Sequence, residues 1–373
     1  MRVLTVIGAR PQFIKAGPVS AALKKLGVDE IIVHTGQHYD RSMSQVFFDE
    51  LQLKPPDINL NVGSGSHGVQ TGAMLAALDP VLTSVKPDCV LVFGDTNSTL
   101  AGALAAVKLH IPVAHVEAGL RSFNRAMPEE INRVVADSIS DLLLAPTETA
   151  VKNLLAEGIP EQRILQTGDV MFDAAIMYGE LASRSAILDR LGLVPQQYVL
   201  ATVHRAENTD NAARLGVIAD GLATASASLK VIWPVHPRTR KALSSMDLGF
   251  HLPRTVVLTE PLGYLDMLQL ERNATVIVTD SGGVQKEAFF CEVPCVTLRD
   301  ETEWTELIAL GWNVLCPPVK SSEAIAGAIL SRRLQRGLSG TPYGDGNAAH
   351  RIAEAIANLK TIQSGEIPFT SLS

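Results

Sequence analysis

Short apolar runs alternate with helix-patterned stretches along most of the chain. Each run is long enough for one strand of a buried sheet. Because strands that alternate with helices build parallel sheets, the pattern predicts an α/β fold with Rossmann-like winding. The predicted strands are Val3–Ile7, Ile31–His34, Cys89–Phe93, Val113–Val116 and Leu142–Ala145 in the first half, and Tyr198–Val203, Val231–Pro234, Val256–Leu258, Thr275–Val278, Cys295–Leu298 and Val314–Cys316 in the second.

The alternation is less regular in one interval, from about Thr167 to Gln197. The length of 373 residues also exceeds one ordinary core, since about 150 residues per domain is typical. We therefore predict two Rossmann-like domains, residues 1–170 and 171–373, with a C-terminal helix that could pack back on the first. Parallel sheets bind ligands at the carboxyl ends of their strands, so two such domains can face one cleft.

Composition narrows the classes of partner. The chain is 46% hydrophobic and 19% charged, as expected for a globular protein. Its net charge of -7 argues against a nucleic-acid surface, and no apolar run approaches the roughly 20 residues that span a bilayer. The N-terminus lacks signal-peptide features, so we predict a cytoplasmic protein with no nucleic-acid or membrane partner. The four cysteines lack the spacing of a zinc site, which predicts buried thiols and no metal.

Polar residues suited to an anion follow the first predicted strand. The turn Gly8-Ala9-Arg10-Pro11-Gln12 precedes Lys15, and the cations Arg10 and Lys15 suit a phosphate. Gly8 permits close approach of the backbone, although glycine turns with nearby cations are common without such a ligand. No Gly-x-Gly-x-x-Gly follows Ile7, which argues against NAD.

Three acidic residues lie at element ends in the first half. Asp95 and Glu117 directly follow two strands, and Glu129 opens a helix after Pro128. As structural alternatives, Asp95 could be a helix N-cap, and Glu129 could compensate a helix dipole or pair with Arg133. Glu117 ends an apolar strand before a glycine, where burial would suit a carboxylate to acid–base chemistry.

The second half carries histidines and a candidate phosphate turn. His204-Arg205 and His236-Pro237-Arg238 follow two strands, where an anion would bind. Ser281 suits an N-cap, and the N–H groups of the helix start at Gly282-Gly283 attract a diphosphate. Glu287 lies on the same helix face as Gly283 and could accept hydrogen bonds from ribose hydroxyls. A plain strand–turn–helix corner is the alternative for this segment, but the three features together favour a nucleotide diphosphate.

Taken together, these segments resemble the non-hydrolysing UDP-N-acetylglucosamine 2-epimerase family over nearly the whole chain. The joint pattern is highly specific because the separated motifs occur in the family's order. They are Gly8-Ala9-Arg10-Pro11-Gln12-Phe13-Ile14-Lys15, Gly36-Gln37-His38, Gly94-Asp95-Thr96, His115-Val116-Glu117-Ala118-Gly119-Leu120-Arg121, Pro128-Glu129-Glu130-Ile131-Asn132-Arg133, His204-Arg205-Ala206-Glu207-Asn208 and Asp280-Ser281-Gly282-Gly283.

The resemblance implies a glycosyltransferase-B type of fold, with the uridine nucleotide held mainly by the second domain. It implies a homodimer that needs no cofactor. The catalytic residues that it implies are Asp95, Glu117, Glu129 and His204. The implied contacts to the UDP-sugar substrate are Arg10, Lys15, Arg133, His236, Ser281, Gly282, Gly283 and Glu287; His236 and the turn Gly36-Gln37-His38 also match part of an activator site for a second UDP-sugar in some relatives.

Inverting C2 of such a sugar is difficult, because a C2–H beside an acetamido group is not acidic. One escape is transient oxidation by a nicotinamide, for which the chain has no fingerprint, and another is loss of UDP from C1, which makes the C2 proton labile. The resemblance implies the second route: elimination to a 2-acetamidoglucal, then re-addition of UDP with C2 reprotonated on the other face. Such an enzyme interconverts UDP-N-acetylglucosamine and UDP-N-acetylmannosamine for polysaccharide biosynthesis. The sequence leaves open which carboxylate is the base and which the acid.

Two stretches depart from the common family pattern. Gln12 stands where many members have glutamate, and Trp304 lies in a segment that replaces Thr-Thr-Glu-Arg-Pro-Glu. With Asn124 and Gln285-Lys286-Glu287, these variants resemble the branch that acts on UDP-2,3-diacetamido-2,3-dideoxyglucuronate. A uronate needs a cation, which Arg10, Lys15 or Arg121 could supply. The whole-chain resemblance places UDP-N-acetylglucosamine first and the uronate second.

Two functions of other classes compete with an epimerase. A UDP-sugar glycosyltransferase would share the fold and the nucleotide site, and a non-catalytic sensor would also bind the nucleotide sugar. The carboxylates Asp95, Glu117 and Glu129 argue against both, because a transferase needs at most one base and a sensor needs none.

Overall fold

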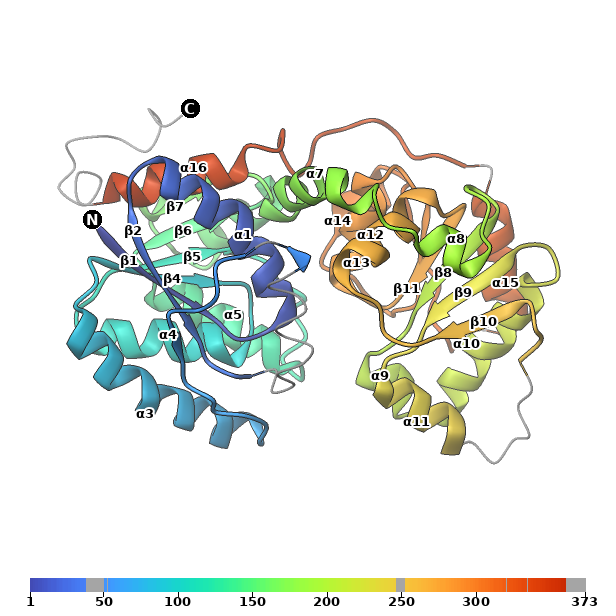
Figure 1. Ribbon diagram of the computed structural model, residues 1–373, viewed down its shortest axis with the longest axis horizontal. Helices are drawn as coiled ribbons and strands as arrows, with labels where there is room; N and C mark the ends of the chain where they lie inside the picture. The colour runs from blue at the N-terminus through green and yellow to red at the C-terminus, as the bar shows by residue number, and fades with distance from the viewer. Residues whose placement is uncertain (38–49, 52, 246–251, 320, 334, 360–373) are drawn as a thin grey trace. The chain divides into compact units, whose positions relative to one another are not determined.

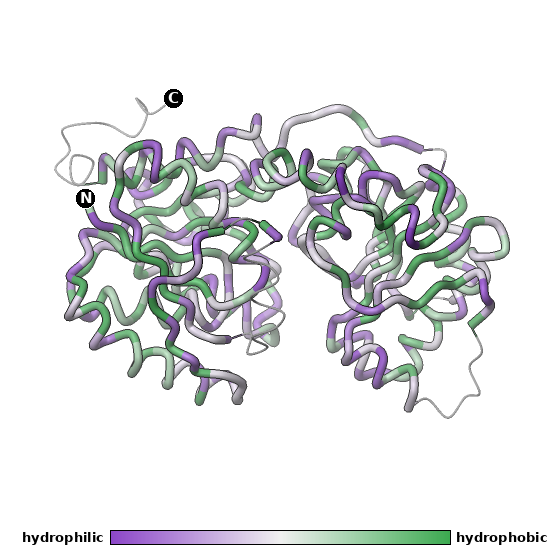
Figure 2. Tube along the Cα trace, in the orientation of Figure 1, coloured by the Kyte–Doolittle hydropathy of each residue, from purple (hydrophilic) through white to green (hydrophobic). Residues whose placement is uncertain are grey.

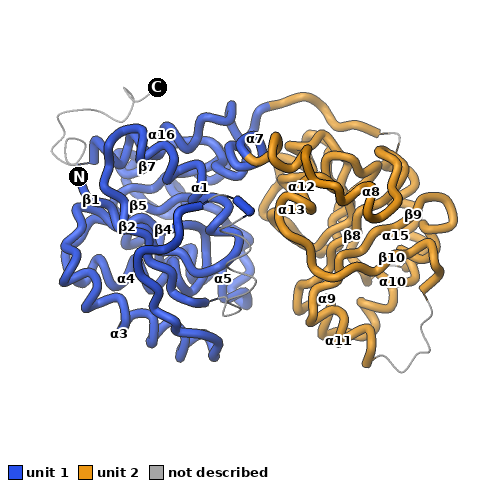
Figure 3. The backbone as a smooth tube through the Cα atoms, in the orientation of Figure 1, with its two compact units in different colours: residues 1–177, 341–373 blue, residues 178–340 orange. Residues whose placement is uncertain are grey.

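The computed structural model of the chain describes residues 1–37, 50–51, 53–245, 252–319, 321–333 and 335–359. The chain forms two compact units, the first from Met1–Met177 and Thr341–Ser373 and the second from Tyr178–Gly340 (Figure 3). The first unit is thus assembled from both ends of the chain. The division runs through helix α7 (Val170–Ala182), whereas the sequence analysis placed it just after residue 170.

The first unit contains a seven-stranded sheet whose paired strands all run parallel. Its order is β3-β2-β1-β4-β5-β6-β7, so successive strands are added outward from β1 on one side and then outward from β4 on the other. The junction of β1 and β4 is therefore a topological switch point, where open α/β sheets bind ligands. The strands are β1 (Arg2–Ile7), β2 (Asp29–His34), β3 (Ile58–Asn59), β4 (Cys89–Phe93), β5 (Val113–Val116), β6 (Leu142–Ala145) and β7 (Ile164–Gln166).

Helices cover both faces of this sheet (Figure 1). Helices α1 and α16 pack against each other on one face, and α3, α4 and α5 form a layer on the other. The described helices of this unit are α1 (Arg10–Lys25), α3 (His67–Val85), α4 (Asn97–Lys108), α5 (Pro128–Ile139), α6 (Glu148–Ala156), the short 3-10 helix η1 (Glu161–Arg163), the first part of α7, and α16 (Ala348–Ala357).

The second unit repeats the architecture with a six-stranded parallel sheet of order β10-β9-β8-β11-β12-β13, which places a switch point between β8 and β11. Its strands are β8 (Tyr198–Thr202), β9 (Lys230–Pro234), β10 (Val256–Thr259), β11 (Val276–Thr279), β12 (Cys295–Thr297) and β13 (Asn313–Leu315). Its helices, besides the end of α7, are α8 (Ile187–Leu191), α9 (Ala206–Thr209), α10 (Ala212–Ala225), α11 (Pro237–Ser245), α12 (Tyr264–Asn273), α13 (Gly282–Phe290), α14 (Thr305–Ala309) and α15 (Ser322–Arg332).

The apolar character of the strands explains the layered architecture. Every residue of β4, β5 and β6 is buried, and Figure 2 shows apolar residues concentrated along the central strands of each unit. Strands that are apolar on both faces must be covered on both faces, which the flanking helices do. Of the helices in the described residues, none combines the length and apolar character that a bilayer span requires.

Every strand predicted from the apolar runs is confirmed to within a residue or two at its ends. The prediction of two sets of parallel strands wound with helices is therefore right. Two strands were missed, β3 and β7, which are short edge strands with only one buried position between them. Such strands lack the continuous apolar run by which the others were recognised.

Candidate active site

The residues predicted from sequence gather at the two switch points, one in each unit. Arg10, Lys15, Asp95, Glu117, Glu129 and Arg133 belong to the first unit, and His204, His236, Ser281, Gly282, Gly283 and Glu287 belong to the second. In the first unit they follow β1, β4 and β5 or open the helices after them. In the second they follow β8, β9 and β11.

Glu117 occupies an unusual backbone position at the end of β5. Phe93 of β4 lies opposite Val116 of β5, so the segments that carry Gly94 and Glu117 leave the sheet side by side. Glu117 has a φ of 67°, in the left-handed region that costs a non-glycine residue roughly 1–3 kcal/mol. Its N–H donates to the carbonyl of Leu144 at 3.1 Å, which helps to hold that conformation.

The Glu117 carboxylate forms an ion pair with the Lys15 ammonium of α1. The two side chains are only 4% and 13% exposed, respectively. Their contact joins the end of β5 to the first helix of the unit. An ion pair shielded from water in this way is stronger than one on the surface, because the surroundings screen the charges less.

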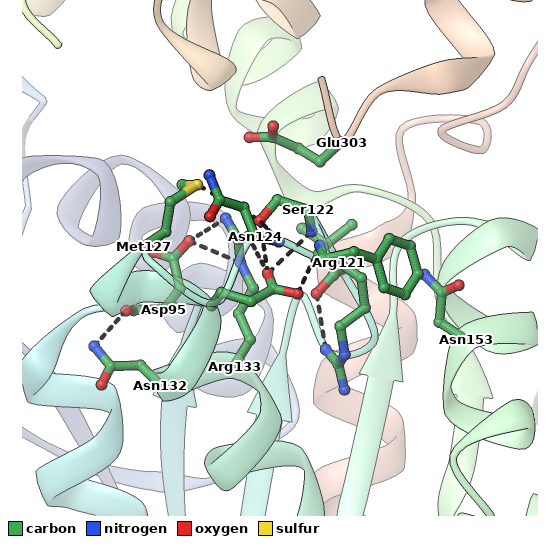
Figure 4. Close-up of polar contacts among 12 residues, drawn as sticks. Asp95, Arg121, Ser122, Asn124, Met127, Asn132, Arg133, Asn153 and Glu303 are labelled. Carbon is green, nitrogen blue, oxygen red and sulfur yellow. Dashed lines mark hydrogen bonds and ion pairs between the residues drawn. The ribbon is translucent and has the colours of Figure 1, made fainter. Parts of the chain in front are cut away.

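Asp95 is not the N-cap of α4, contrary to the structural alternative from sequence. The cap is Thr96, whose hydroxyl accepts from the Thr99 N–H at 3.3 Å. The Asp95 carboxylate instead accepts from Arg133 of α5, at 3.0 Å from Nε and 2.6 Å from Nη2 (Figure 4). Asn132 also donates to the Asp95 carbonyl at 2.8 Å, so α5 fixes both the backbone and the side chain of Asp95.

The two glutamates that open α5 have different environments. Glu129 is exposed, whereas Glu130 is 2% exposed and accepts from the N–H groups of Ser122 and Phe123, at 2.9 Å each. Burial would raise the pKa of Glu130, but these hydrogen bonds and Arg133 lower it overall. Arg133 thus links Asp95 to Glu130, the neighbour of the predicted Glu129.

Gln12 organises the turn after β1. Its side-chain oxygen accepts from the N–H groups of Gly8 and Ala9, and its amide donates to the Phe93 carbonyl at 2.8 Å and to the hydroxyls of Thr96 and Thr99. An amide can accept at one end and donate to a carbonyl at the other, which an ionised carboxylate cannot do. Gln12 is 1% exposed, so it joins the first strand end to the second from within the core.

Gly8 is required by packing against the protein itself. A methyl group at this position would overlap the hydroxyls of Ser98 and Thr35, which hydrogen-bond each other at 2.8 Å. The close backbone approach expected at Gly8 therefore involves these hydroxyls. Arg10, the first residue of α1, is half-buried beside this turn.

Asp280 anchors the candidate site of the second unit. It directly follows β11, is fully buried, and accepts from the N–H groups of His204, at 3.1 Å, and Arg205, at 3.0 Å. The Asn208 amide adds a further hydrogen bond at 3.0 Å. His204 places its Nδ1 atom 3.6 Å from the same carboxylate, with its side chain 46% exposed. Asp280 therefore fixes the turn that carries the predicted catalytic histidine.

The start of α13 has the predicted cap. The Ser281 hydroxyl accepts from the Val284 N–H at 3.4 Å, which confirms Ser281 as the N-cap. A Cβ atom on Gly282 would lie 2.7 Å from the Glu303 carboxylate, so the loop after β12 already approaches the backbone here. Around Gly283 the space is open, the nearest atom to such a Cβ being the Ser281 hydroxyl at 3.9 Å. The turn can therefore admit a ligand at Gly283 more readily than at Gly282.

Glu287 lies at the edge of a buried acidic group between α12 and α13. It is 6% exposed, and Glu271 and Tyr264 of α12 are buried near it. Burial, and then the charge of Glu287, raises the pKa of Glu271 well above its usual range. The pKa of Tyr264 is raised for the same reasons.

His236 lies on the exposed turn after β9. The centroids of the two imidazole rings are 6.4 Å apart. The Nδ1 atom of His236 accepts from the Arg238 N–H at 3.2 Å, which orients the ring. The two histidines predicted at strand ends are thus neighbours. His38, from the turn Gly36-Gln37-His38 that was matched to the activator site together with His236, lies outside the described residues.

The variant residues of the second unit pack against one another. The Lys286 ammonium lies 4.3 Å from the centroid of the Trp304 ring, and the Thr302 hydroxyl donates to Gln285 at 2.8 Å. Lys286, Trp304 and Gln285 are all buried. Within the described residues, no group of three or more His, Cys, Asp or Glu side chains is arranged to hold a metal ion.

Several residues of these networks were absent from the predicted set, namely Gln12, Glu130, Asn208 and Asp280. All four stood inside the quoted motifs, so residue type was visible in the sequence. What was not visible is that each supports a neighbouring residue by hydrogen bonds from within the core.

Comparisons with known proteins agree over nearly the whole chain. The sequence profile of the UDP-N-acetylglucosamine 2-epimerase family matches residues 21–357. A UDP-N-acetylglucosamine 2-epimerase homolog of Methanococcus maripaludis is 51% identical over 363 residues, covering 96% of this chain and 100% of the relative. The UDP-2,3-diacetamido-2,3-dideoxy-D-glucuronate 2-epimerase of Pseudomonas aeruginosa is 47% identical over 365 residues, covering 96% and 100%.

Comparisons with solved structures indicate the same family. The UDP-GlcNAc 2-epimerase of Methanocaldococcus jannaschii, crystallised with UDP-GlcNAc and UDP, superposes with a TM-score of 0.89 at 44% identity, covering 96% of this chain and 99% of that one. The forosaminyltransferase SpnP, at 15% identity and a TM-score of 0.55, shares the fold alone. These likenesses confirm the predicted glycosyltransferase-B type of fold. The chain therefore belongs to the UDP-N-acetylglucosamine 2-epimerase family, as an isomerase that acts on UDP-sugars without hydrolysing them.

Proposed function

We propose that the chain interconverts UDP-N-acetylglucosamine and UDP-N-acetylmannosamine by eliminating UDP and adding it back. The observation that carries this proposal is the pair Asp95 and Glu117, which follow neighbouring strands and are each paired with a cation. In the elimination, the C1–O bond to UDP breaks and a carboxylate removes the C2 proton, which leaves 2-acetamidoglucal. In the re-addition, a UDP oxygen bonds to C1 and an acid returns a proton to the other face of C2.

Each catalytic residue has a proposed part in this sequence. Asp95, Glu117 and Glu129 supply the base and the acid, and the order of their roles is left open. His204 stabilises the diphosphate as it departs. Because its Nδ1 atom faces the buried Asp280, its Nε2 atom is the one that meets the ligand.

Polar groups at the start of α13 are proposed to bind the diphosphate and the ribose of the nucleotide sugar. Gly282 and Gly283 offer helix-start N–H groups to the diphosphate, and Ser281, whose own N–H donates to the Thr279 hydroxyl, contributes its side chain. Glu287 accepts from the ribose hydroxyls. The remaining proposed contacts are Arg10, Lys15, Arg133 and His236.

The choice of N-acetylglucosamine is supported by where the variant residues lie. Gln12 is 1% exposed and Trp304 is 4% exposed, so neither presents a surface to a sugar. Arg121, one of the cations considered for a uronate, already pairs with Asp137 at 2.7 Å and with Glu157 at 2.6 Å. Lys286, the cation among the variants, is 1% exposed and lies against the Trp304 ring, so the variants present no new cation to a carboxylated sugar.

The diacetamido-glucuronate is the second candidate. It is favoured by the 47% identity to the Pseudomonas aeruginosa enzyme, which is named for that substrate. Homodimeric assembly and a cytoplasmic location stay predictions from the sequence, and sedimentation velocity would test the first.

Proton NMR in deuterated water tests the proposed route. The purified protein is given each UDP-sugar without NAD or an acceptor. We expect epimerisation with solvent deuterium at C2, because the abstracted proton exchanges with solvent before the carbon is reprotonated. Retention of the original C2 hydrogen would contradict elimination, and transfer of the sugar would favour a glycosyltransferase. The same assay yields kcat/KM for both sugars, and a tenfold preference for the uronate, about 1.4 kcal/mol, would reverse our order of substrates.

Glu287→Gln should weaken nucleotide binding more than it slows chemistry. Loss of a charged hydrogen-bond acceptor costs about 1.5–3 kcal/mol, or roughly 10- to 100-fold in the dissociation constant for UDP. Isothermal titration with UDP measures this change. The control is Glu292→Gln, which removes one carboxylate from an exposed ion pair with Arg336 and should leave binding unchanged. Equal affinity in wild type and Glu287→Gln would remove the ribose assignment.

A further inference from the structure

A buried histidine lies beneath the two carboxylate-bearing segments of the first unit. His115 belongs to β5 and is fully buried. Its Nε2 atom lies 2.7 Å from the Gly94 carbonyl oxygen, and its Nδ1 atom lies 2.7 Å from a carboxylate oxygen of Asp137 on α5. The ring thus joins the residue before Asp95 to the helix that carries Arg133.

These contacts fix the protons on the ring. A carbonyl oxygen can only accept, so Nε2 must carry a proton. The second oxygen of Asp137 accepts from the Gly119 N–H at 3.0 Å and lies 2.7 Å from the Arg121 guanidinium. Both contacts favour an ionised Asp137, which can only accept from Nδ1. Both ring nitrogens are therefore donors, and the ring is an imidazolium.

We propose that His115 is a positioning residue: a doubly protonated imidazolium that fixes the Asp95 segment relative to the Glu117 segment. It acts through the Gly94 carbonyl on one side and through Asp137 on the other, and it touches no substrate. Asp137 completes the connection, because it also holds the backbone of Gly119, two residues after Glu117. The inference rests on the proposed catalytic roles of Asp95 and Glu117.

The charges that face this ring come from several elements. Asp137 lies on α5, Glu117 and Arg121 follow β5, Lys15 of α1 pairs with Glu117, and Glu157 next to α6 pairs with Arg121. Burial lowers the pKa of His115, but the hydrogen bond to Asp137 and the charge of Asp137 outweigh it and raise the pKa overall. A raised pKa in the folded state means that the contribution to stability is present at acidic pH. It is lost as pH rises through the folded-state value, on the alkaline side of the usual histidine range.

NMR of the full chain labelled with nitrogen-15 at histidine tests the protonation state without any assay of activity. We expect the two ring nitrogens of His115 to show imidazolium shifts at pH values where an ordinary exposed histidine is already neutral. The resonance is identified by its absence in His115→Gln. If that variant does not fold, the resonance is identified by the slow exchange of its ring N–H protons with solvent, since the His115 ring is buried. A neutral-imidazole signature at pH 7 would overturn the proposal.

Kinetics test the positioning role. His115→Gln should lower kcat by about 10- to 100-fold, because small displacements of catalytic groups have effects of that size, with the dissociation constant for UDP within about twofold. The wild-type kcat should also fall at alkaline pH with the midpoint at which the imidazolium signal disappears. The control, His110→Asn, changes an exposed histidine of the same unit and should match wild type. An inactive wild type would refute the proposed function, whereas an active wild type with unchanged kcat in folded His115→Gln would refute the positioning role.

Discussion

Glu117→Gln is expected to lower kcat for epimerisation by roughly 10²- to 10⁴-fold, the usual effect of removing a general acid or base. Glutamine has nearly the same shape, so the left-handed backbone at residue 117 and the contact with Leu144 should remain. The Lys15 ion pair is lost, and with it the carboxylate that we propose as a base or an acid at C2. NMR of the C2 signal in deuterated water measures both turnover and exchange.

The control for Glu117→Gln is Glu148→Gln. Glu148 pairs with Lys152 at 2.8 Å on the surface of α6, where both side chains are mostly exposed. Surface pairs of this kind contribute little, so this variant should retain wild-type kcat. Calorimetry of both variants confirms that the first unit is folded. A folded Glu117→Gln with more than about a tenth of the wild-type kcat would remove Glu117 from the catalytic set.

Asp280→Ala should destabilise the second unit by about 3 kcal/mol or more, because several buried donors would lose their shared acceptor. These donors are the N–H groups of His204 and Arg205 and the amide of Asn208. The turn that carries His204 would lose its anchor, so UDP affinity should fall by at least tenfold, about 1.4 kcal/mol. Denaturant unfolding followed by tryptophan fluorescence reports on this unit, because Trp233, Trp304 and Trp312 all belong to it.

Asp280→Asn separates charge from hydrogen bonding. An asparagine oxygen can still accept from Arg205 and Asn208, so the loss of stability should be only about 1 kcal/mol. His204 Nδ1 lies 3.6 Å from the Asp280 carboxylate. If the charge of Asp280 orients the imidazole, kcat should fall in Asp280→Asn even though the variant stays folded. If Asp280→Ala has the same free energy of unfolding as the wild type, water satisfies these donors and the carboxylate is not an anchor.

The two units use the same structural plan for different proposed tasks. In each, an acidic residue follows a strand at the switch point, and its neighbours hold it by hydrogen bonds. Asp95 pairs with Arg133 and its side chain is 30% exposed. Asp280 is fully buried and faces backbone N–H groups, as an anchor requires. Burial alone does not distinguish the two roles, because the proposed catalytic Glu117 is only 4% exposed.

The sequence by itself determined the local elements of this protein. Apolar runs predicted every central strand, because a strand covered on both faces must be apolar throughout. The same pattern missed β3 and β7, which have a single neighbour in the sheet and few buried positions. The N-cap at Ser281 was also predictable, since capping depends on residues a few positions apart.

The tertiary structure decided which strands are neighbours and which charges meet. Strand order places β1 beside β4 and β8 beside β11, and no periodicity in the sequence encodes that choice. Arg133 and Asp95 are 38 positions apart, so their pairing was hidden, whereas the expected local pairing of Arg133 with Glu129 followed from helical spacing. Gln12, Asp137 and Asp280 were equally hidden as supports. Sequence periodicity reports local geometry, but the partner of a buried polar group depends on how distant elements pack.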